Sequence, residues 1–154
     1  MKKSYAIIFK VIMALYMVCL FWAAVIHRIN DVWTAAGFTR YAWAFTNVIP
    51  FRTFFELAQT PGAQNVPVIL HTFLLNFLAL IPFGILFCLI FREKNAGHCA
   101  IAAAILTLLL NIAKLVFHAG SFDIDDMIVG TAGAVLAFLV TKLLLNPIRR
   151  QPAT

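Results

Sequence analysis

The sequence predicts an all-α integral membrane protein with four transmembrane helices. Hydrophobic residues make up 63% of the 154 residues and charged residues only 12%, whereas a soluble domain has about 45–50% apolar and about 25% charged residues. The apolar residues form runs long enough to cross about 30 Å of hydrocarbon at about 1.5 Å per helical residue. Basic residues flank these runs and do not cluster with aromatic residues, so the formal charge of +6 indicates membrane topology and no nucleic-acid partner.

The first span is expected at about residues 5–26. Lys2 and Lys3 precede it as in a signal sequence, but the apolar run is longer than the typical core of about 7–15 residues. We therefore expect a retained helix, with cleavage near Trp22-Ala23-Ala24 as the alternative. Lys10 lies near the start of the span and can extend its amine to the headgroups.

The connection at residues 27–67 is too aromatic for a free loop. Because Trp and Tyr favour the membrane interface, interfacial or re-entrant helices are expected between spans one and two. Pro50 fits the first turn of one such helix, and Thr60-Pro61-Gly62 would end it. Arg52 and Glu56 are four residues apart and would share a face of that helix.

The second span is expected at about residues 68–91 and contains an amide, a proline and a glycine. Lipid cannot satisfy the amide of Asn76, which should therefore point into the bundle, as a ligand contact or as a link between helices. Pro82 removes a backbone donor and should kink the helix. Gly84 would allow a neighbouring helix to approach closely.

Spans three and four are expected at about residues 99–117 and 127–145. Gly130 and Ala134 form a small-x-x-x-small step, which is typical of close helix packing. We see no domain boundary, so residues 1–154 are expected to form a single membrane domain.

The charges predict which side of the membrane each connection faces. With four spans, one side receives a basic set: Lys2, Lys3, Lys10, Arg92, Lys94, Lys142, Arg149 and Arg150. The other side receives an acidic set: Asp31, Glu56, Asp123, Asp125 and Asp126. The positive-inside rule makes the basic side cytoplasmic, so both termini are expected there and the long connection and the aspartates outside.

A polar stripe on span three marks the candidate site. Asn111, Lys114 and His118 recur at helical spacing, and Asp126 follows beyond a short turn. A charged amine at the centre of a membrane helix costs roughly 2.5–3.5 kcal/mol. Three interpretations of Lys114 follow. It is an anion or proton site, or it forms a structural ion pair with Asp125 or Asp126, or its amine extends to the outer headgroups. His118 is a candidate proton shuttle, with an ordinary interfacial histidine as the alternative.

The aspartates also allow more than one interpretation. Asp126 is a candidate site carboxylate or a helix N-cap with a favourable position in the helix dipole. Asp123, Asp125 and Asp126 could together hold a divalent cation, but no further carboxylate follows nearby, and no metal site is predicted. We recognise no set of nucleophile, base and orienting group and no phosphate-binding glycine loop, so neither enzyme chemistry of the soluble type nor a cofactor is predicted.

Three blocks of the sequence resemble the motifs of the VanZ-like family, in order and spacing, over roughly residues 40–140. The blocks are Asn47-Val48-Ile49-Pro50-Phe51, then Asn76 with Pro82-Phe83-Gly84, then Phe122-Asp123-Ile124-Asp125-Asp126 with Gly133. The resemblance implies a small multi-pass protein of the bacterial plasma membrane. Some members of the family are associated with resistance to glycopeptide antibiotics, teicoplanin in particular, without a change in the usual peptidoglycan target.

The chain departs from the family pattern in the third block. Family members often carry Glu and Gln three residues apart on the third span and Arg before the aspartates, where this chain holds Asn111, Lys114 and Ser121. The usual Asn after the aspartates is Gly130 here. The predicted site is therefore more basic than the family pattern.

The leading hypothesis is a binding protein of the bacterial plasma membrane. Its outward-facing polar pocket would hold an amphiphile with an anionic head, such as a lipid-linked cell-wall precursor, a phospholipid or a lipoglycopeptide antibiotic. The candidate ligand-binding residues are Arg52, Asn76, Asn111, Lys114, His118 and Asp126, supported by Asn47, Asp123 and Asp125. Arg52 and Lys114 would meet the anion, and Asp126 would hold both cations in place.

Two alternatives stay open. The first is an intramembrane enzyme or proton-coupled transporter of a lipid-linked substrate, with Asp126, His118 and Lys114 transferring protons. The second is a structural scaffold in which the polar residues only join helices.

Overall fold

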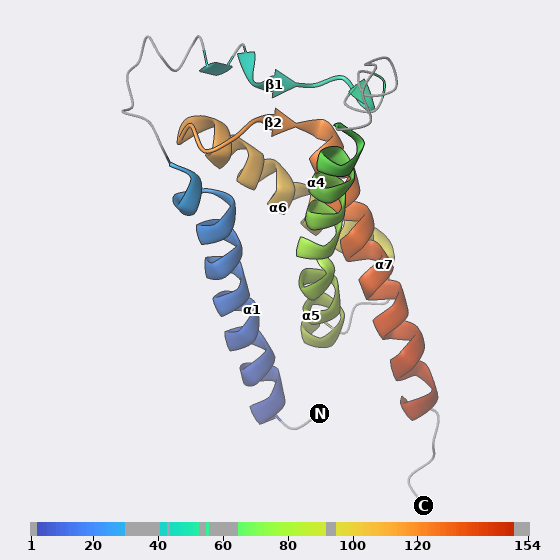
Figure 1. Cartoon of the computed structure of the whole chain (residues 1–154). Helices are drawn as coiled ribbons and strands as arrows, with labels where there is room; N and C mark the ends of the chain where they lie inside the picture. The colour runs from blue at the N-terminus through green and yellow to red at the C-terminus, as the bar shows by residue number, and fades with distance from the viewer. Residues whose placement is uncertain are drawn as a thin grey trace, which may run out of the picture.

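Among the described residues, four helical segments are long and apolar enough to cross a membrane, as the sequence predicts: Tyr5–Arg28, Phe73–Phe91, Ala96–Val116 and Ile124–Leu145. The computed structural model describes residues 3–29, 41–42, 44–52, 55, 65–91 and 95–149. The elements are α1 (Lys3–Ala24), the 3-10 helix η1 (Ile26–Arg28), β1 (Thr46–Asn47), α4 (Asn65–Ala79), α5 (Ile81–Phe91), α6 (Ala96–Val116), β2 (Phe122–Asp123) and α7 (Ile124–Arg149). Figure 1 shows that α1 begins and α7 ends at the same end of the molecule, with β1 and β2 at the other.

Helix α7 is the centre of the bundle and packs against α4, α5 and α6. Close approach is possible because two glycines lie at the crossings: a Cβ on Gly84 would meet the backbone carbonyl of Ala134, and one on Gly133 would meet the carbonyl of Phe77. The main cluster of buried apolar residues is small and contains Leu80, Phe83, Cys88, Cys99, Ala103, Ala134 and Phe138. Most large apolar side chains lie instead on the outer surface, where lipid covers them.

The predicted kink in span two is confirmed as a break, because the helix is interrupted at Leu80 between α4 and α5. Pro82 has no N–H, so it cannot donate to the carbonyl four residues earlier. At the break, the Tyr16 hydroxyl of α1 donates to the carbonyl of Ala79. The broken backbone is therefore one of the places where α1 is attached to the rest of the bundle.

The connection between spans one and two contains a strand that the sequence did not predict. β1 pairs in parallel with β2, with Thr46 opposite Phe122 and Asn47 opposite Asp123. The Phe122 N–H also donates to the Phe45 carbonyl at 2.9 Å. In Figure 1, β1 lies across the ends of the helices above β2. Glu56 and Thr60-Pro61-Gly62 lie outside the described residues.

Helices α4, α6 and α7 each begin three residues earlier than predicted, and a side chain caps two of them, α6 and α7. Asn95 precedes α6 and accepts a hydrogen bond from the Gly97 N–H at 2.8 Å. Asp123 precedes α7 and accepts from the Asp125 N–H at 2.9 Å. The N-cap position is therefore that of Asp123, and Asp126 lies in the first turn, where its charge still suits the helix dipole.

Candidate functional site

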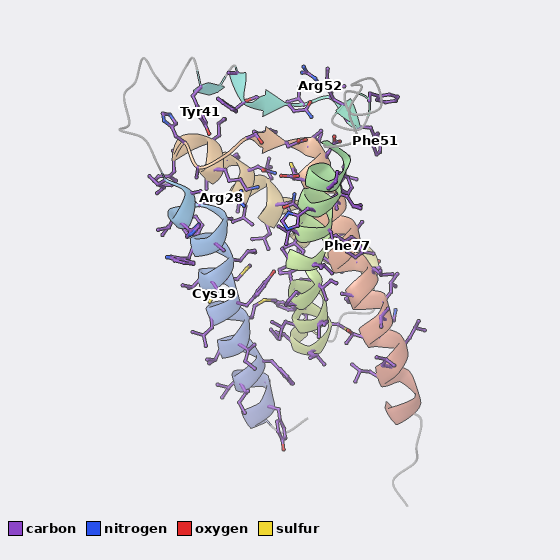
Figure 2. All side chains as sticks on the ribbon, viewed as in Figure 1. Cys19, Arg28, Tyr41, Phe51, Arg52 and Phe77 are labelled. Atoms are coloured by element: carbon purple, nitrogen blue, oxygen red, sulfur yellow. The ribbon has the colours of Figure 1, made fainter. Side chains whose placement is uncertain are left out.

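A cavity of about 230 Å³ lies between α1, η1, α4, α6 and α7. It is lined by Leu20, Ala23, Ala24, Arg28, Leu75, Asn76, Ala79, Leu80, Thr107, Leu110, Asn111, Lys114, Asp126 and Gly130. Most of this lining is apolar, and the polar groups come from α4, α6, α7 and η1. Arg28 lies at the end of the α1 segment that is nearer to β1 (Figure 2).

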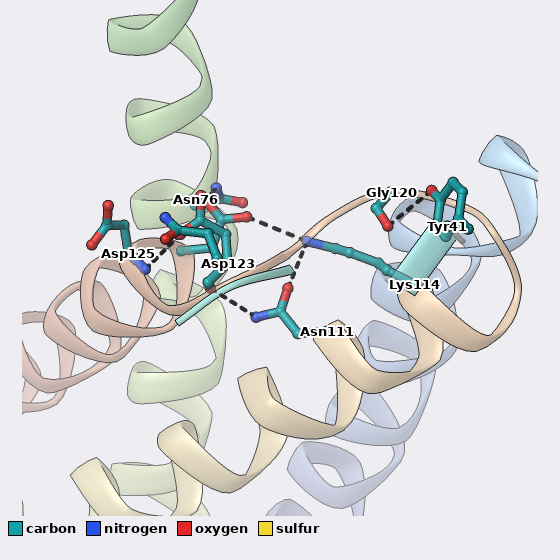
Figure 3. A network of polar contacts seen from close by, with 9 residues as sticks. Tyr41, Asn76, Asn111, Lys114, Gly120, Asp123 and Asp125 are labelled. Atoms are coloured by element: carbon teal, nitrogen blue, oxygen red, sulfur yellow. Dashed lines mark hydrogen bonds and ion pairs between the residues drawn. The ribbon is translucent and has the colours of Figure 1, made fainter. Parts of the chain in front are cut away.

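Four polar side chains form one connected network beside the cavity (Figure 3). The Lys114 amine lies 3.5 Å from Asp126 Oδ2 and donates to Asn111 Oδ1 at 3.4 Å. Asn76 Nδ2 donates to Asp126 Oδ1 at 2.5 Å. The side chains of Lys114 and Asp126 are 13% and 18% exposed, and Asn111 is 2% exposed. The network therefore joins three helices inside the protein.

Local structure explains why these groups meet. Asn111 and Lys114 are three residues apart on α6 and so share a face of that helix. Asp126 lies in the first turn of α7, where unpaired backbone N–H groups favour a negative charge. Asn76 lies on α4, one turn before the break at Leu80. The close packing of α7 against α4 and α6 then brings the three segments together.

The described lining of the cavity carries an excess of positive charge. Lys114 and Asp126 form an ion pair that is formally neutral. Arg28 adds a second cation to the lining, and none of the acids in the described part of the chain forms an ion pair with it. An anion entering this cavity would therefore meet a guanidinium and a neutralised amine in one lining, a setting that favours negative charge.

The other two aspartates fasten the connection to the bundle. Asp123 Oδ1 accepts from Asn47 Nδ2 at 3.1 Å, and its carbonyl accepts from Asn111 Nδ2 at 3.3 Å. Asp125, which is 2% exposed, accepts from the Phe51 N–H at 2.6 Å. Within the described residues there is no group of three or more His, Cys, Asp or Glu side chains placed to hold a metal ion.

His118 lies away from the cavity lining. Helix α6 ends at Val116, and His118 has a left-handed backbone with φ of 52°, so it does not continue the stripe of Asn111 and Lys114. Its ring is 9% exposed and stacks on Tyr41 with a centroid distance of 4.5 Å. The Tyr41 hydroxyl donates to the Gly120 carbonyl at 3.1 Å. His118 is therefore part of the contact between the connection and the turn after α6.

Arg52 also lies outside the cavity lining. It is exposed on the connection beside Phe51, at the far side of the β1 strand from α1 (Figure 2). The expected grouping of Arg52 with Lys114 around Asp126 is thus not what the structure has. Asn76, Asn111, Lys114 and Asp126 come together as expected, and Asn47, Asp123 and Asp125 lie next to them in a supporting layer.

Sequence reasoning missed Arg28 and Thr107. Arg28 could have been found as a cation that directly follows span one, on the side that receives most of the acidic residues. Thr107 precedes Asn111 by four residues and shares its face of α6. Its hydroxyl donates its hydrogen to the helix carbonyl of Ala103 at 3.0 Å, so this hydrogen is already used within α6.

The fold and the site together define a multi-pass α-helical membrane protein with a small cavity bearing two cations at one end of its bundle. The sequence profile of the VanZ/LLP1 family matches residues 10–145. The chain belongs to this family, which is linked to glycopeptide resistance, and the resemblance found in the sequence is confirmed. Neither a comparison with curated proteins nor one with solved structures returned a significant match.

Proposed function

We propose that this protein binds the anionic head of an amphiphile in the cavity between α1, η1, α4, α6 and α7. The observation that carries the proposal is the pair of cations, Lys114 and Arg28, in the lining of one cavity whose remaining wall is mostly apolar. A head with negative charge suits the cations, and the hydrocarbon next to the head suits the apolar wall.

The ion pair leaves donors available for a ligand. An ammonium has three N–H groups, and within the described part of the chain Lys114 contacts two acceptors, Asn111 and Asp126. A phosphate or carboxylate oxygen would take the third N–H of Lys114 and the N–H groups of Arg28. Asp126 and Asn76 would hold the Lys114 amine in position and would not themselves contact the anion.

The size of the cavity suits a head rather than a whole lipid. Pockets that enclose a drug-sized ligand measure about 300–1,000 Å³, and this one has about 230 Å³. The tails of the amphiphile would therefore lie along the helices in the bilayer. A phospholipid, a lipid-linked cell-wall precursor and a lipoglycopeptide share this chemistry.

We propose further that the cavity opens toward the outer side of the bacterial plasma membrane. Asp123, Asp125 and Asp126 lie at the β1–β2 end of the bundle, and among the described basic residues Lys3, Lys10, Lys142 and Arg149 lie toward the other end. The positive-inside rule then makes the end with both termini cytoplasmic. The ligand would be one of the outer leaflet.

Binding measurements on two variants test the proposal. The purified protein, in phosphatidylcholine nanodiscs, would be titrated with fluorescent phosphatidylglycerol, a polyprenyl phosphate and teicoplanin. Lys114→Met and Arg28→Gln each remove one charged hydrogen bond, worth about 1.5–3 kcal/mol, so affinity for the bound probe should fall about 10- to 100-fold. Lys10→Gln is the control, because Lys10 is exposed on α1 outside the cavity lining.

Arg28→Gln keeps the test decisive if Lys114→Met folds poorly, because Arg28 is exposed on η1. Unchanged affinity in Arg28→Gln for every probe that binds the wild type would overturn the proposal. Absence of binding by all three probes to the wild type would overturn it as well. The proton-transfer alternative is weaker, because His118 lies outside the cavity that contains Lys114 and Asp126.

A further inference from the structure

A second, fully apolar groove lies between α4 and α7. It has a volume of about 330 Å³ and is lined by Leu70, Phe73, Leu74, Phe77, Ile128, Val129 and Ala132. The α4 residues of this groove recur at the spacing i, i+3, i+4, i+7 and so form one helix face. Asn76 and Ala79 lie on another side of α4 and line the polar cavity. The groove is therefore distinct from the cavity described above.

The packing of α7 on α4 explains why the groove exists. Gly133 brings the two backbones together at the carbonyl of Phe77, which closes the lower end of the groove. One residue earlier, Ala132 offers only a methyl group, so the space beside it stays open. Leu70 and Leu74, which are 66% and 52% exposed, form one rim, and Ile128, at 40%, forms the other.

One residue of the connection, Phe51, is fixed at the start of α7, one of the two helices that line the groove. Phe51 is held there because its N–H donates to Asp125, which precedes Ile128 by one helical turn. Figure 2 places Phe51 beside the upper ends of α4 and α7, with Phe77 further down between them. Phe51 has a left-handed backbone with φ of 63° and is 51% exposed. A strained, exposed aromatic residue is an unusual arrangement that calls for a functional reason.

Residues next to Phe51 have the character of a membrane interface. Val48, Ile49 and Phe55 are 62%, 56% and 64% exposed, and Arg52 is an exposed cation among them. Apolar side chains around a cation suit the boundary between headgroups and acyl chains. The groove runs along α4 and α7, two helices with segments long and apolar enough to cross the membrane, and Asp125 of α7 holds Phe51 of this surface.

We propose that the α4–α7 groove is a binding site for one acyl chain of an anionic phospholipid in the leaflet nearest β1. The chain lies between Leu74 and Ile128 against Ala132. The phosphate lies beside Arg52, and Phe51 covers the chain where it leaves the glycerol. The lining contains no polar side chain, so it selects hydrocarbon, and selection of the head depends on Arg52.

Photolabelling tests the site in the full-length protein. The protein would be reconstituted in phosphatidylcholine vesicles that contain a trace of phosphatidylglycerol with a diazirine on its acyl chain, and the labelled residues would be mapped by mass spectrometry. Label should concentrate on the peptides that contain Leu70–Phe77 and Ile128–Ala132. Ala132→Leu fills the groove and should reduce this label roughly fourfold for each methylene of the chain that it displaces.

A matched variant and a headgroup comparison complete the test. Ala14→Leu adds the same side chain at an exposed position of α1 outside the groove and should leave the label unchanged. Arg52→Gln should abolish the preference for labelled phosphatidylglycerol over labelled phosphatidylcholine. Uniform labelling of all lipid-facing helices, or equal labelling of wild type and Ala132→Leu, would overturn the proposal.

Two further outcomes distinguish a lipid groove from a dimer interface and from the polar cavity. Crosslinks between two copies of the protein through α4 and α7, lost in Ala132→Leu, would overturn the proposal in favour of a dimer interface. Arg28→Gln alters the polar cavity only and should leave the groove label unchanged. Loss of anion binding in Arg28→Gln tests the polar cavity, and the groove label tests the lipid site, so either proposal can fail without the other.

Discussion

At the scale of single residues, the polar groups inside the spans have partners from other segments. Lys114 contacts Asp126 across two helices, and Asn76 contacts the same carboxylate from a third. Asn111 bridges Lys114 to the backbone of Asp123. Because lipid offers no hydrogen bonds, each of these contacts replaces one that water would have made. The ion pair therefore contributes to stability as well as to the proposed site.

A double-mutant cycle should reveal the coupling between Lys114 and Asp126. Lys114→Met leaves a buried carboxylate without its cation and should destabilise the protein by about 3 kcal/mol. Adding Asp126→Asn removes that carboxylate and keeps an acceptor for Asn76, so the double variant should recover more than half of the loss. Unfolding in mixed micelles would measure the free energies, and strictly additive effects would contradict the coupling.

Asp125 should act on the connection rather than on the cavity. Asp125→Ala removes the acceptor of the Phe51 N–H, a charged hydrogen bond worth about 1.5–3 kcal/mol. Hydrogen exchange of the amides around Phe51 should therefore accelerate, while the affinity of the cavity for its anionic probe should change little. Ser121→Ala, at an exposed position of the nearby turn, serves as the comparison. Equal protection of Phe51 in both variants would contradict the role assigned to Asp125.

The sequence predicts the meeting of Asn76, Asn111, Lys114 and Asp126 because each would be costly alone in lipid. It misplaces His118, since helical periodicity gives no sign that the chain turns at Val116 and passes through a left-handed backbone. It also misplaces Arg52. The position of Arg52 depends on the hydrogen bond from the N–H of the neighbouring Phe51 to Asp125, which is 74 residues further along the chain. Such long-range backbone contacts leave no periodic signal in the sequence.

At the scale of elements, α1 differs from the other spans. It packs mainly against α5, and none of the most apolar stretch of this span is buried in the protein. The bond from Tyr16 to the Ala79 carbonyl ties α1 to the break between α4 and α5. Since α1 also forms one wall of the polar cavity, through Leu20 and Ala24, its attachment decides whether that cavity keeps its shape.

Removal of the Tyr16 hydroxyl should loosen α1 selectively. Tyr16→Phe keeps the ring and loses one hydrogen bond, which within membrane proteins is worth about 0.6 kcal/mol on average and up to about 1.7. Distance measurements between spin labels on α1 and α6 should give a broader distribution than in the wild type. Tyr5→Phe, at a position that is 53% exposed, should give no broadening. Identical distance distributions in the wild type, Tyr16→Phe and Tyr5→Phe would show that the Tyr16 hydrogen bond does not hold α1 in place.

The glycines at the helix crossings should tolerate no methyl group. Gly84→Ala and Gly133→Ala place a Cβ against the backbone of the partner helix, which has no flexible end to move aside. Thermal unfolding in detergent should show losses of about 1–3 kcal/mol or more, the usual cost of overpacking. Gly120→Ala meets only the Lys114 side chain at 3.7 Å and should stay near the wild type. A larger loss of stability in Gly120→Ala than in Gly84→Ala and Gly133→Ala would contradict the close packing of α7 against α4 and α5.

The spans themselves are well predicted, because apolar length and composition define a membrane helix. The break in span two follows from Pro82 alone. The pairing of β1 with β2 is not predictable in the same way. Strands of two residues, Thr46–Asn47 and Phe122–Asp123, are too short to show an alternating pattern. Their pairing depends on the position of α7, which brings Asp123 near the connection.

At the scale of the whole molecule, both ends of the described chain lie at one end of the bundle and both strands at the other (Figure 1). Cysteine labelling should determine the orientation. In a chain whose three cysteines are replaced by alanine, Ser121→Cys, near the strands, should react with an impermeant maleimide from outside the intact cell. Asn95→Cys, at the start of α6, should react only after the cell is opened. Both positions are exposed, and the reverse pattern would overturn the proposed topology.

The strand pairing also imposes an order on biogenesis. Asn47 binds Asp123, which is synthesised 76 residues later, and at translation rates of about 5–20 residues per second this delay is roughly 4–15 s. During that interval the nascent connection has no partner strand, and it must wait until α6 has been inserted. Until β2 has been made and α7 packs on the bundle, the connection is therefore accessible to proteases and to membrane chaperones.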